Sequence, residues 1–235
     1  MGNLKHITFT GVDEKTNLRT LQHIQNVYPK AEFGVLTSYH WYENGNRYMD
    51  PMLIKNLRGT RLHLALHLCG SAAHDATNGF WSDINHLLYG NLDIFPRVQL
   101  NVATRKDNPE YIIHNTNKEI IVQAKGIDDT KLFDSTRSWY PESKCSILLD
   151  GSGGRGIDTG IEVLNNNEKV GYAGGINPDN VKEKLEYLLE NVDGDFWIDM
   201  ESGVRTGDWF DVEKVVAVLK ICDQVLNSPK ENKAI

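Results

Sequence analysis

Short apolar runs alternate with amphipathic segments along almost the whole chain. The runs that predict strands cover residues 4–10, 32–37, 61–69, 96–101, 119–124, 144–150, 169–172 and 196–200. Between them, apolar residues recur at helical spacing, as in Leu18, Leu21 and Ile24, which predicts helices. These predicted helices cover residues 15–28, 51–57, 79–89, 108–115, 129–138, 159–164, 177–189 and 212–226.

Eight strand-plus-helix units predict one α/β domain, a (β/α)8 TIM barrel over residues 1–227 with a polar tail over residues 228–235. A doubly wound sheet is the alternative architecture. It is disfavoured because no G-x-G-x-x-G turn follows the first strand. The glycine-rich turns instead gather in the last third of the chain, where barrels of this class hold phosphate.

Three glycine-rich turns follow the last three apolar runs. Glycine permits positive φ and close approach of the backbone to a ligand. Unpaired N–H groups where a helix starts attract anions. At the ends of parallel barrel strands, such turns predict a phosphate site. Its expected backbone donors belong to Gly154, Gly156, Gly174, Gly175, Ser202 and Gly203.

Composition and charge narrow the range of partners. A formal net charge of -7 argues against a nucleic-acid-binding or membrane-surface role, because both call for a basic face. No apolar run is long enough to cross a bilayer, and residues 1–6 lack the apolar region of a signal peptide. We therefore expect a cytoplasmic protein that binds neither nucleic acid nor a membrane.

Cysteine and histidine spacing gives no sign of a metal site. The three cysteines, Cys69, Cys145 and Cys222, lie far apart and match neither a disulfide framework nor a zinc motif. His63 and His67 could share one face of a strand, but no H-x-E or H-E-x-x-H pattern accompanies them. We expect reduced thiols, no metal and no cofactor.

Five motifs, in this order, resemble the phosphoribosylanthranilate isomerase family of tryptophan biosynthesis. They are Asn-Arg-Tyr at 46–48, Val-Gln-Leu at 98–100, Leu-Leu-Asp with Gly-Gly-Arg-Gly at 148–156, Ala-Gly-Gly-Ile-Asn-Pro-Asp-Asn-Val at 173–181, and Ile-Asp-Met-Glu-Ser-Gly-Val at 198–204. The resemblance implies a TIM barrel, a monomer or a homodimer, whose partner is a small phosphorylated sugar and whose substrate is a phosphorylated ribose derivative. The implied reaction is an Amadori rearrangement, which converts an N-linked ribose phosphate from an aldose to a ketose.

The chain departs from the family at two positions that matter for the chemistry. Where the family's first strand ends in K-I-C-G, this chain has Thr8-Phe9-Thr10-Gly11. Thr10 therefore replaces the family's general-base cysteine, and an alkyl hydroxyl is not appreciably ionised at neutral pH. The fourth-strand motif ends in Asn101-Val102, where the family has His-Gly. The resemblance thus supports the phosphate-binding half of the site better than the catalytic half.

An Amadori rearrangement needs one group to protonate the ring oxygen and another to remove the C2 proton. Asp150, at a strand end beside the glycine-rich turns, is the expected general acid. Three residues remain open as the base. Asp13 could reach in from the first loop, Cys69 ends a strand in a local copy of the missing motif, and His67 could act at its ordinary pKa.

The resemblance also implies residues that contact the substrate. Arg47 matches the family's substrate-gripping arginine, whose fork suits a carboxylate or phosphate, and Asp199 would face the substrate's amine. The other expected substrate contacts are Thr10, Gln99 and Asn101.

Two other functions stay open. The first is a non-catalytic or repurposed barrel that binds a phosphosugar or nucleotide. The second is a different phosphosugar reaction, either an epimerisation or a Schiff-base cleavage through Lys125.

Overall fold

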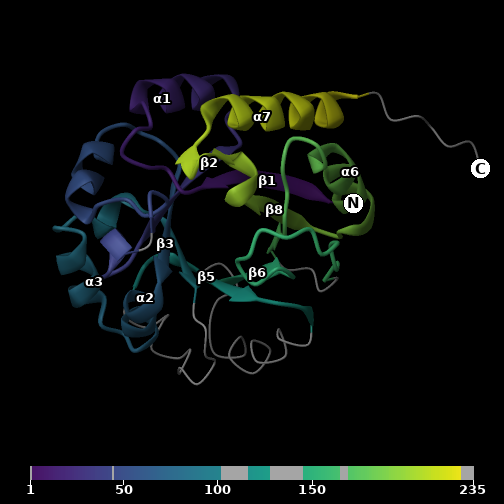
Figure 1. The fold of residues 1–235 in the computed structure, drawn as a ribbon. Helices are drawn as coiled ribbons and strands as arrows, with labels where there is room; N and C mark the ends of the chain where they lie inside the picture. The colour runs from purple at the N-terminus through teal and green to yellow at the C-terminus, as the bar shows by residue number, and fades with distance from the viewer. Residues whose placement is uncertain (1, 44, 102–115, 128–144, 165–168, 229–235) are drawn as a thin grey trace, which may run out of the picture.

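Eight parallel strands form a closed barrel in which each strand pairs with its neighbour in sequence and the last pairs with the first. The computed structural model describes residues 2–43, 45–101, 116–127, 145–164 and 169–228 (Figure 1). The strands are β1 (Asn3–Thr10), β2 (Ala31–Thr37), β3 (Leu64–Cys69), β4 (Arg97–Asn101), β5 (Glu119–Ala124), β6 (Cys145–Asp150), β7 (Val170–Ala173) and β8 (Asp195–Met200). This topology confirms the predicted (β/α)8 barrel.

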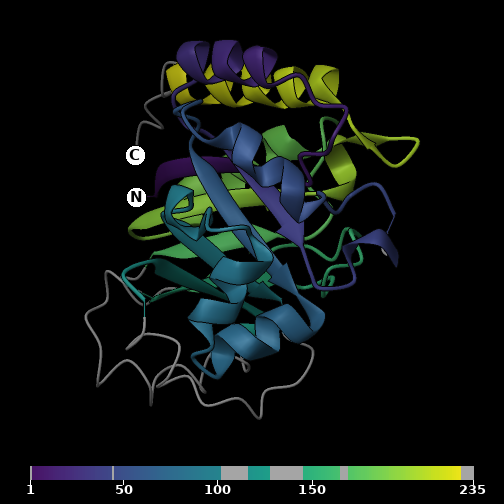
Figure 2. The same cartoon turned by 90° about the vertical axis from the view of Figure 1, so that its left-hand side faces the viewer.

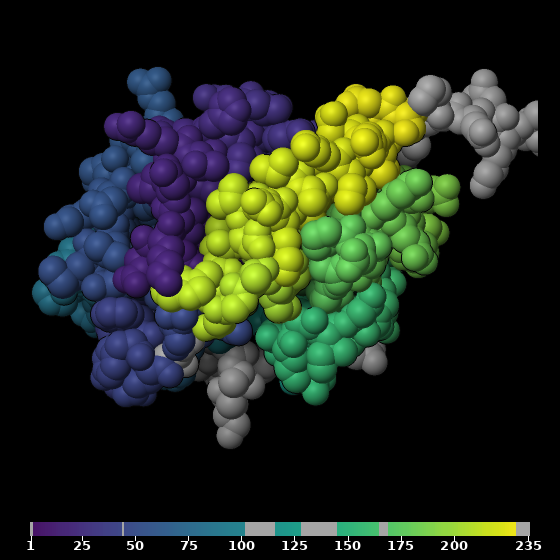
Figure 3. Space-filling model, turned by 45° about the horizontal axis from the view of Figure 1, so that its top comes forward, coloured from purple at the N-terminus to yellow at the C-terminus, as the bar shows by residue number. Residues whose placement is uncertain are grey.

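Helices surround the barrel. The α-helices among the described residues are α1 (Leu18–Val27), α2 (Gly70–Thr77), α3 (Trp81–Leu87), α6 (Val181–Asn191) and α7 (Val212–Asn227). Short 3-10 helices are η1 (Trp41–Glu43), η2 (Pro51–Leu57), η3 (Leu92–Ile94) and η5 (Ser202–Val204), and a small hairpin pairs β9 (Arg205–Thr206) with β10 (Trp209–Phe210). Helices α1 and α7 lie side by side over the closure of the barrel (Figures 1–3). No described helix has the length and apolar character needed to cross a membrane.

Capping side chains explain where the first and last helices begin. Asn17 accepts hydrogen bonds from the N–H groups of Arg19 and Thr20 at the start of α1. Asp211 does the same for Glu213 and Lys214 at the start of α7. Each cap satisfies N–H groups that have no partner inside the helix.

The structure differs from the predicted helices in two places. Helix α2 was not expected, because Gly-Ser-Ala-Ala carries little of the apolar periodicity on which the prediction depends. The helix expected over 159–164 does not form. Gly160, within this range, has a positive φ, which breaks a right-handed helix. The helices expected over 108–115 and 129–138, and the tail from 229, lie outside the described residues.

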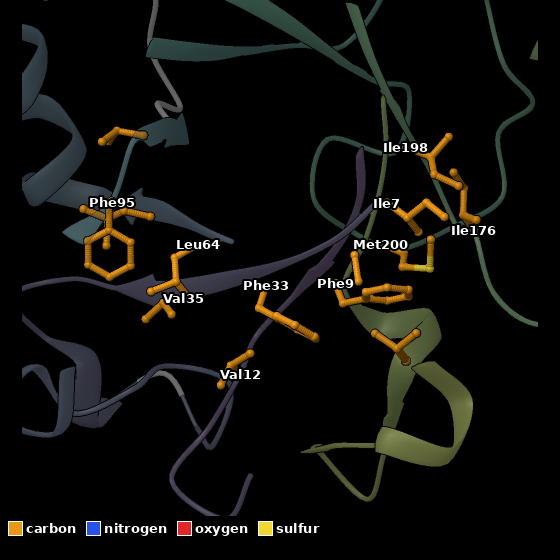
Figure 4. Packing of buried hydrophobic residues seen from close by; sticks show 14 of the residues in the cluster. Ile7, Phe9, Val12, Phe33, Val35, Leu64, Phe95, Ile176, Ile198 and Met200 are labelled. Carbon is orange, nitrogen blue, oxygen red and sulfur yellow. The ribbon is translucent and has the colours of Figure 1, made fainter. Parts of the chain in front are cut away.

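The main hydrophobic core lies between the barrel and its helices. Alternate residues of a strand point to opposite faces, so the outer face of β1 carries Ile7 and Phe9, both buried. The Phe9 ring lies 6.4 Å from that of Phe33 on β2, measured between centroids. Figure 4 shows these residues beside Met200 of β8. The inward faces of the strands are thereby left for other chemistry.

The N-terminal half of the barrel interior is filled by the Trp197 indole and a buried ion-pair network. Trp197 packs with Ile121 and Leu148 in a small separate cluster. Arg97 lies 4.5 Å from the centre of the Trp197 ring, and its guanidinium is 2.5 Å from Glu32 and 3.3 Å from Glu119. Because this network fills the N-terminal half of the barrel, the space for a site is left at the C-terminal ends of the strands.

Candidate active site

A polar cavity opens at the C-terminal ends of the barrel strands, where TIM barrels carry their active sites. Every predicted site residue lines this cavity except Asp13, Cys69 and Gly203. Leu148 and Ala173 contribute its apolar surface in the barrel, and the turns after β6, β7 and β8 form one wall. The structure therefore brings most of the predicted site residues together around one cavity.

Asp150 accepts four hydrogen bonds at the end of β6. Its Oδ1 receives the Ser152 N–H at 3.0 Å and the Ser152 hydroxyl at 2.7 Å. Its Oδ2 receives the Gln123 amide at 2.7 Å and the Gly154 N–H at 2.6 Å. All four groups donate, and an ionised carboxylate is the acceptor-only form of this side chain. The structure thus holds Asp150 as a hydrogen-bond acceptor.

Asp199 has a different environment at the end of β8. It is buried, and the Thr10 hydroxyl donates a 2.7 Å hydrogen bond to its Oδ1. Burial raises the pKa of Asp199 to about 7; the Thr10 hydrogen bond opposes this shift, and the nearby carboxylates Glu201, Glu32 and Asp150 add to it. Asp199 therefore holds its proton up to about pH 7.

The two aspartates lie at the same level of the barrel with one strand between them. Asp150 pairs with Ala173 across β6 and β7, and Tyr172 pairs with Ile198 across β7 and β8, so Ala173 faces Asp199. Two strand spacings separate their backbones by roughly 10 Å. Because both side chains line the cavity, a small substrate between them could contact both.

None of the three residues expected as the base fits that role. His67 lines the cavity 3.5 Å from the Thr10 hydroxyl, but burial, with a contribution from Arg97, lowers its pKa to about 3. Burial raises the pKa of the Cys69 thiol, which keeps it protonated. An imidazole of such low pKa and a protonated thiol are both poor bases near pH 7.

Asp13 anchors the backbone outside the cavity. Its Oδ2 accepts the Phe210 N–H at 2.6 Å, and its Oδ1 accepts from Lys15 and Thr16. The Nη2 atom of Arg205 lies 3.5 Å from Asp13 Oδ2. These contacts fasten the β9–β10 hairpin to the loop after β1, so we withdraw Asp13 from the candidate bases.

The turns expected to bind phosphate differ in how many N–H groups they leave available. The N–H groups of Gly154 and Gly156 are donated to Asp150 and to the Ser152 hydroxyl. Those of Gly174 and Gly175 donate to no other described residue, and both glycines have positive φ. The side chains of Ser202 and Arg155 also line this wall.

Gly203 lies behind that wall. An added Cβ there would meet the Ile176 carbonyl oxygen at 2.0 Å, so this glycine permits close packing between two turns.

Arg47 reaches the cavity from the loop after β2 but is already paired. Its Nη1 is 3.0 Å from Glu201 Oε1, and its Nη2 is 3.5 Å from Asp208 Oδ1. Gln99 and Asn101 line the same side and are joined by a 2.9 Å hydrogen bond. The guanidinium is thus paired with two carboxylates, one of which, Asp208, also lies 3.7 Å from Arg205 Nε.

Sequence reasoning missed three residues that shape the site: Gln123, Ser152 and Glu201. Gln123 could have been found, because it shares the inward face of its strand with Ile121. Ser152 and Glu201 carry no such signal, since their positions depend on how the turns fold.

The alternative chemistries find little support in the described residues. They contain no group of histidine, cysteine and acidic side chains arranged to hold a metal ion. Lys125, the candidate for Schiff-base cleavage, does not line the cavity. It lies in a separate hollow on the outside of β6, near Gly151 and Gly160.

Comparisons with known proteins agree with this geometry. The family model of N-(5'-phosphoribosyl)anthranilate isomerase matches residues 98–221. The structure of that enzyme from Pyrococcus furiosus is 14% identical, with a TM-score of 0.59, over 94% of this chain and 100% of the other. Monomers generated from the dimeric enzyme of Thermotoga maritima give 15% identity and a TM-score of 0.59 over 94% and 99%.

A third similar structure is thiamine phosphate pyrophosphorylase from Pyrococcus furiosus, with 16% identity and a TM-score of 0.54 over 95% and 98% of the two chains. At these identities the structures show a shared fold alone. No curated protein sequence matches the chain. The family model, however, covers more than half of the chain, including the strands that carry Asp150 and Asp199. The chain therefore belongs to the N-(5'-phosphoribosyl)anthranilate isomerase family.

Proposed function

We propose that this protein is an aldose–ketose isomerase that carries out an Amadori rearrangement on an N-linked ribose phosphate. The observation that carries the proposal is the placement of Asp150 and Asp199 at one level of the cavity, beside the glycine-rich turns. One carboxyl group retains a proton near neutral pH and the other is held as an acceptor. A pair of carboxyl groups with such different environments suits acid and base roles in one reaction.

The substrate's phosphate binds at the turns after β6, β7 and β8. The N–H groups of Gly174 and Gly175, the Ser202 hydroxyl and the positive charge of Arg155 favour an anion there. A phosphate that also takes the Gly154 N–H would draw this donor away from Asp150 Oδ2. Phosphate binding would then leave a lone pair of Asp150 facing the ribose.

In this proposal Asp199 is the general acid and Asp150 the general base, which reverses the role expected for Asp150 from the sequence. Asp199 gives its proton to the ring oxygen as the C1–O4 bond breaks, and the amine nitrogen supplies the electron pair. Asp150 then takes the proton from C2, which gives an enol. The enol gains a proton at C1 and loses its hydroxyl proton, leaving a ketone at C2. Solvent exchange returns a proton to Asp199 and removes one from Asp150, so the reaction is a net isomerisation.

Turnover of freshly generated phosphoribosylanthranilate, followed by fluorescence at high enzyme concentration, tests the proposal. We expect slow turnover by the wild type and a loss of at least about a hundredfold in both Asp150→Asn and Asp199→Asn. The exposed variant Asp179→Asn is the matched control and should retain activity. Either cavity variant keeping most of the wild-type activity would remove that residue from the mechanism.

A non-catalytic phosphosugar-binding barrel is the second candidate function. Thr10 supports it, because the general-base cysteine of the family is missing. This candidate predicts that ribose 5-phosphate raises the melting temperature in a saturable way, while no arylamine derivative of it is converted at any pH.

A further inference from the structure

The Asp150 carboxylate uses its full hydrogen-bonding capacity in the free protein. A carboxylate offers about four lone-pair positions. The N–H and the hydroxyl of Ser152 occupy two of them at Oδ1. The Gln123 amide and the Gly154 N–H occupy the other two at Oδ2. One of these donors must leave before Asp150 can accept a proton from a substrate.

Gly154 carries the donor that a ligand can take. Ser152 is buried and Gln123 is partly buried, whereas Gly154 is exposed and lines the cavity. Gly153 and Gly154 both have positive φ, and the conformational freedom of glycine lets the peptide group between them turn toward a ligand at little cost. An anion at this turn would therefore draw the Gly154 N–H away from Asp150.

Ser152 connects the same turn to a second donor. Its hydroxyl donates to Asp150 Oδ1 at 2.7 Å and accepts the Gly156 N–H at 3.1 Å. Gly156 lines the cavity, and a Cβ there would collide with the Ser202 hydroxyl of the same wall. An anion on this wall could take the Gly156 N–H, while the Ser152 hydroxyl keeps its bond to Asp150.

Asp150 also lies next to the turn after β7, where backbone donors are available. A Cβ on Gly174 would lie 3.9 Å from Asp150 Oδ1, and the Gly174 N–H donates to no other described residue. An anion so close to a carboxylate is repelled. Arg155 offsets part of this repulsion, because its Nε donates to the Ser152 carbonyl at 2.9 Å and it lines the cavity.

We propose that the substrate's phosphate activates Asp150 and that Ser152 is the positioning residue for this step. The phosphate takes the N–H groups of Gly154 and Gly156. This frees one lone pair at Asp150 Oδ2, while Ser152 holds Oδ1 in place. A sugar without a phosphate leaves Asp150 fully hydrogen-bonded. This inference rests on the proposed function for its reaction, and it makes the phosphate a requirement of proton transfer as well as of binding.

NMR of the protein with isotope-labelled glycine and aspartate, titrated with ribose 5-phosphate, tests the rearrangement without any turnover. We expect the amide resonances of Gly154 and Gly156 to shift on saturation, together with the carboxyl carbon resonance of Asp150. Ribose is the control ligand and should move none of them. Shifts confined to Gly174 and Gly175, or no saturable binding of ribose 5-phosphate, would overturn the inference.

The same titration separates this inference from the proposed function. If these resonances shift but phosphoribosylanthranilate is not converted, the rearrangement driven by phosphate stands and the isomerase proposal fails.

A substrate in two pieces measures the activation itself. The ribosylamine of anthranilate lacks the phosphate, and inorganic phosphite can occupy the phosphate site beside it. We expect phosphite to raise kcat/KM for this ribosylamine in a saturable way, by at least about tenfold, because the binding energy of the anion is then used in the reaction of another molecule. If phosphite shifts the glycine resonances but gives no activation, in a protein that converts phosphoribosylanthranilate, the inference fails and the proposed function stands.

Ser152→Ala and Ser202→Ala remove the same hydroxyl at two positions of one wall. Ser152→Ala loses a bond that positions Asp150 and releases the Gly156 N–H to the phosphate, so kcat should fall by about tenfold while KM stays equal or falls. Ser202→Ala removes a hydroxyl offered to the phosphate, so KM should rise and kcat should change less. Calorimetry with ribose 5-phosphate should give the same contrast in Kd. A raised KM with unchanged kcat in Ser152→Ala would place Ser152 in phosphate binding and overturn its positioning role.

Discussion

The Thr10 hydroxyl donates its proton to Asp199 Oδ1 at 2.7 Å, across the seam where β1 meets β8. This bond links the position at which the chain departs from its family to a buried carboxyl group. Because the only hydroxyl proton of Thr10 is used in this way, Thr10 faces His67 as an acceptor, 3.5 Å from Nε2. Thr10 therefore tunes Asp199 and takes no proton from the substrate itself.

The pH dependence of kcat/KM tests the role of Asp199. A general acid must be protonated in the free enzyme, and the pKa of Asp199 is raised to about 7. We expect kcat/KM to fall as pH rises above about 7, approaching tenfold per pH unit. Ribose 5-phosphate binding over the same range controls for ionisation of the phosphate. A rate that rises through pH 7 would make Asp199 the base and contradict our assignment.

Substitutions at Thr10 should shift the pH at which kcat/KM begins to fall, and the hydrogen bond to Asp199 fixes the direction of this shift. The hydrogen bond from Thr10 lowers the pKa of Asp199 against the effect of burial. Thr10→Val keeps the shape and removes the hydrogen-bond donor, so kcat/KM should begin to fall at a higher pH. Thr10→Ser keeps the donor and should leave the pH profile of kcat/KM unchanged. If both variants behave alike in the pH profile, the hydroxyl does not act on Asp199.

Thermal stability provides a readout of Asp199 that needs no substrate. Its pKa rises from 3.8 in the unfolded chain to about 7 in the folded one, so between these values the folded state binds the proton more tightly. The stabilisation from proton binding is complete below about pH 4 and is lost as pH rises through 7. Asp199→Asn cannot titrate. The unfolding free energy of Asp199→Asn relative to wild type should therefore increase from pH 4 to pH 8 by an amount on the order of a few kcal/mol. The difference in melting temperature between the two proteins should increase with it.

The matched control for this measurement is Asp179→Asn, an exposed carboxyl group at the entrance to α6. Its difference from wild type gives the effect of removing one surface carboxyl group, which is subtracted from the effect of Asp199→Asn. A flat difference for Asp199→Asn would then mean that burial does not perturb this carboxyl group.

The sequence predicted the barrel because its signals are local. Each strand is a short apolar run, and the Asp50–Pro51 pair shows the start of η2 directly. The strand-end positions of Asp150 and Asp199 also follow from the runs that precede them. Helix α2 escaped prediction because its alanines and glycine give no clear apolar stripe.

The roles of the site residues could not be predicted in the same way, because they depend on contacts between distant segments. Four donors from β5 and the turn after β6 hold Asp150 as an acceptor, and burial at the end of β8 raises the pKa of Asp199 to about 7. One partner of Arg47, Glu201, is 154 positions away and is reached only when β2 and β8 come to one end of the barrel. A residue's type suggests its chemistry, whereas its protonation state follows from the fold.

The absence of a side chain at Gly171 leaves room for Trp197, and this yields a last prediction. A Cβ on Gly171 would lie 2.2 Å from Trp197 Cε2 and 2.7 Å from Leu148 Cδ1. Both neighbours are buried, and the indole lies against Arg97, so neither can move freely. Gly171→Ala should lower the unfolding free energy by about 1–3 kcal/mol, the usual cost of overpacking. Urea denaturation measures this cost. Trp197→Leu removes the ring, so in the double variant Gly171→Ala should cost clearly less than in the wild type. Equal costs in both backgrounds would show that the indole is not what excludes a side chain at position 171.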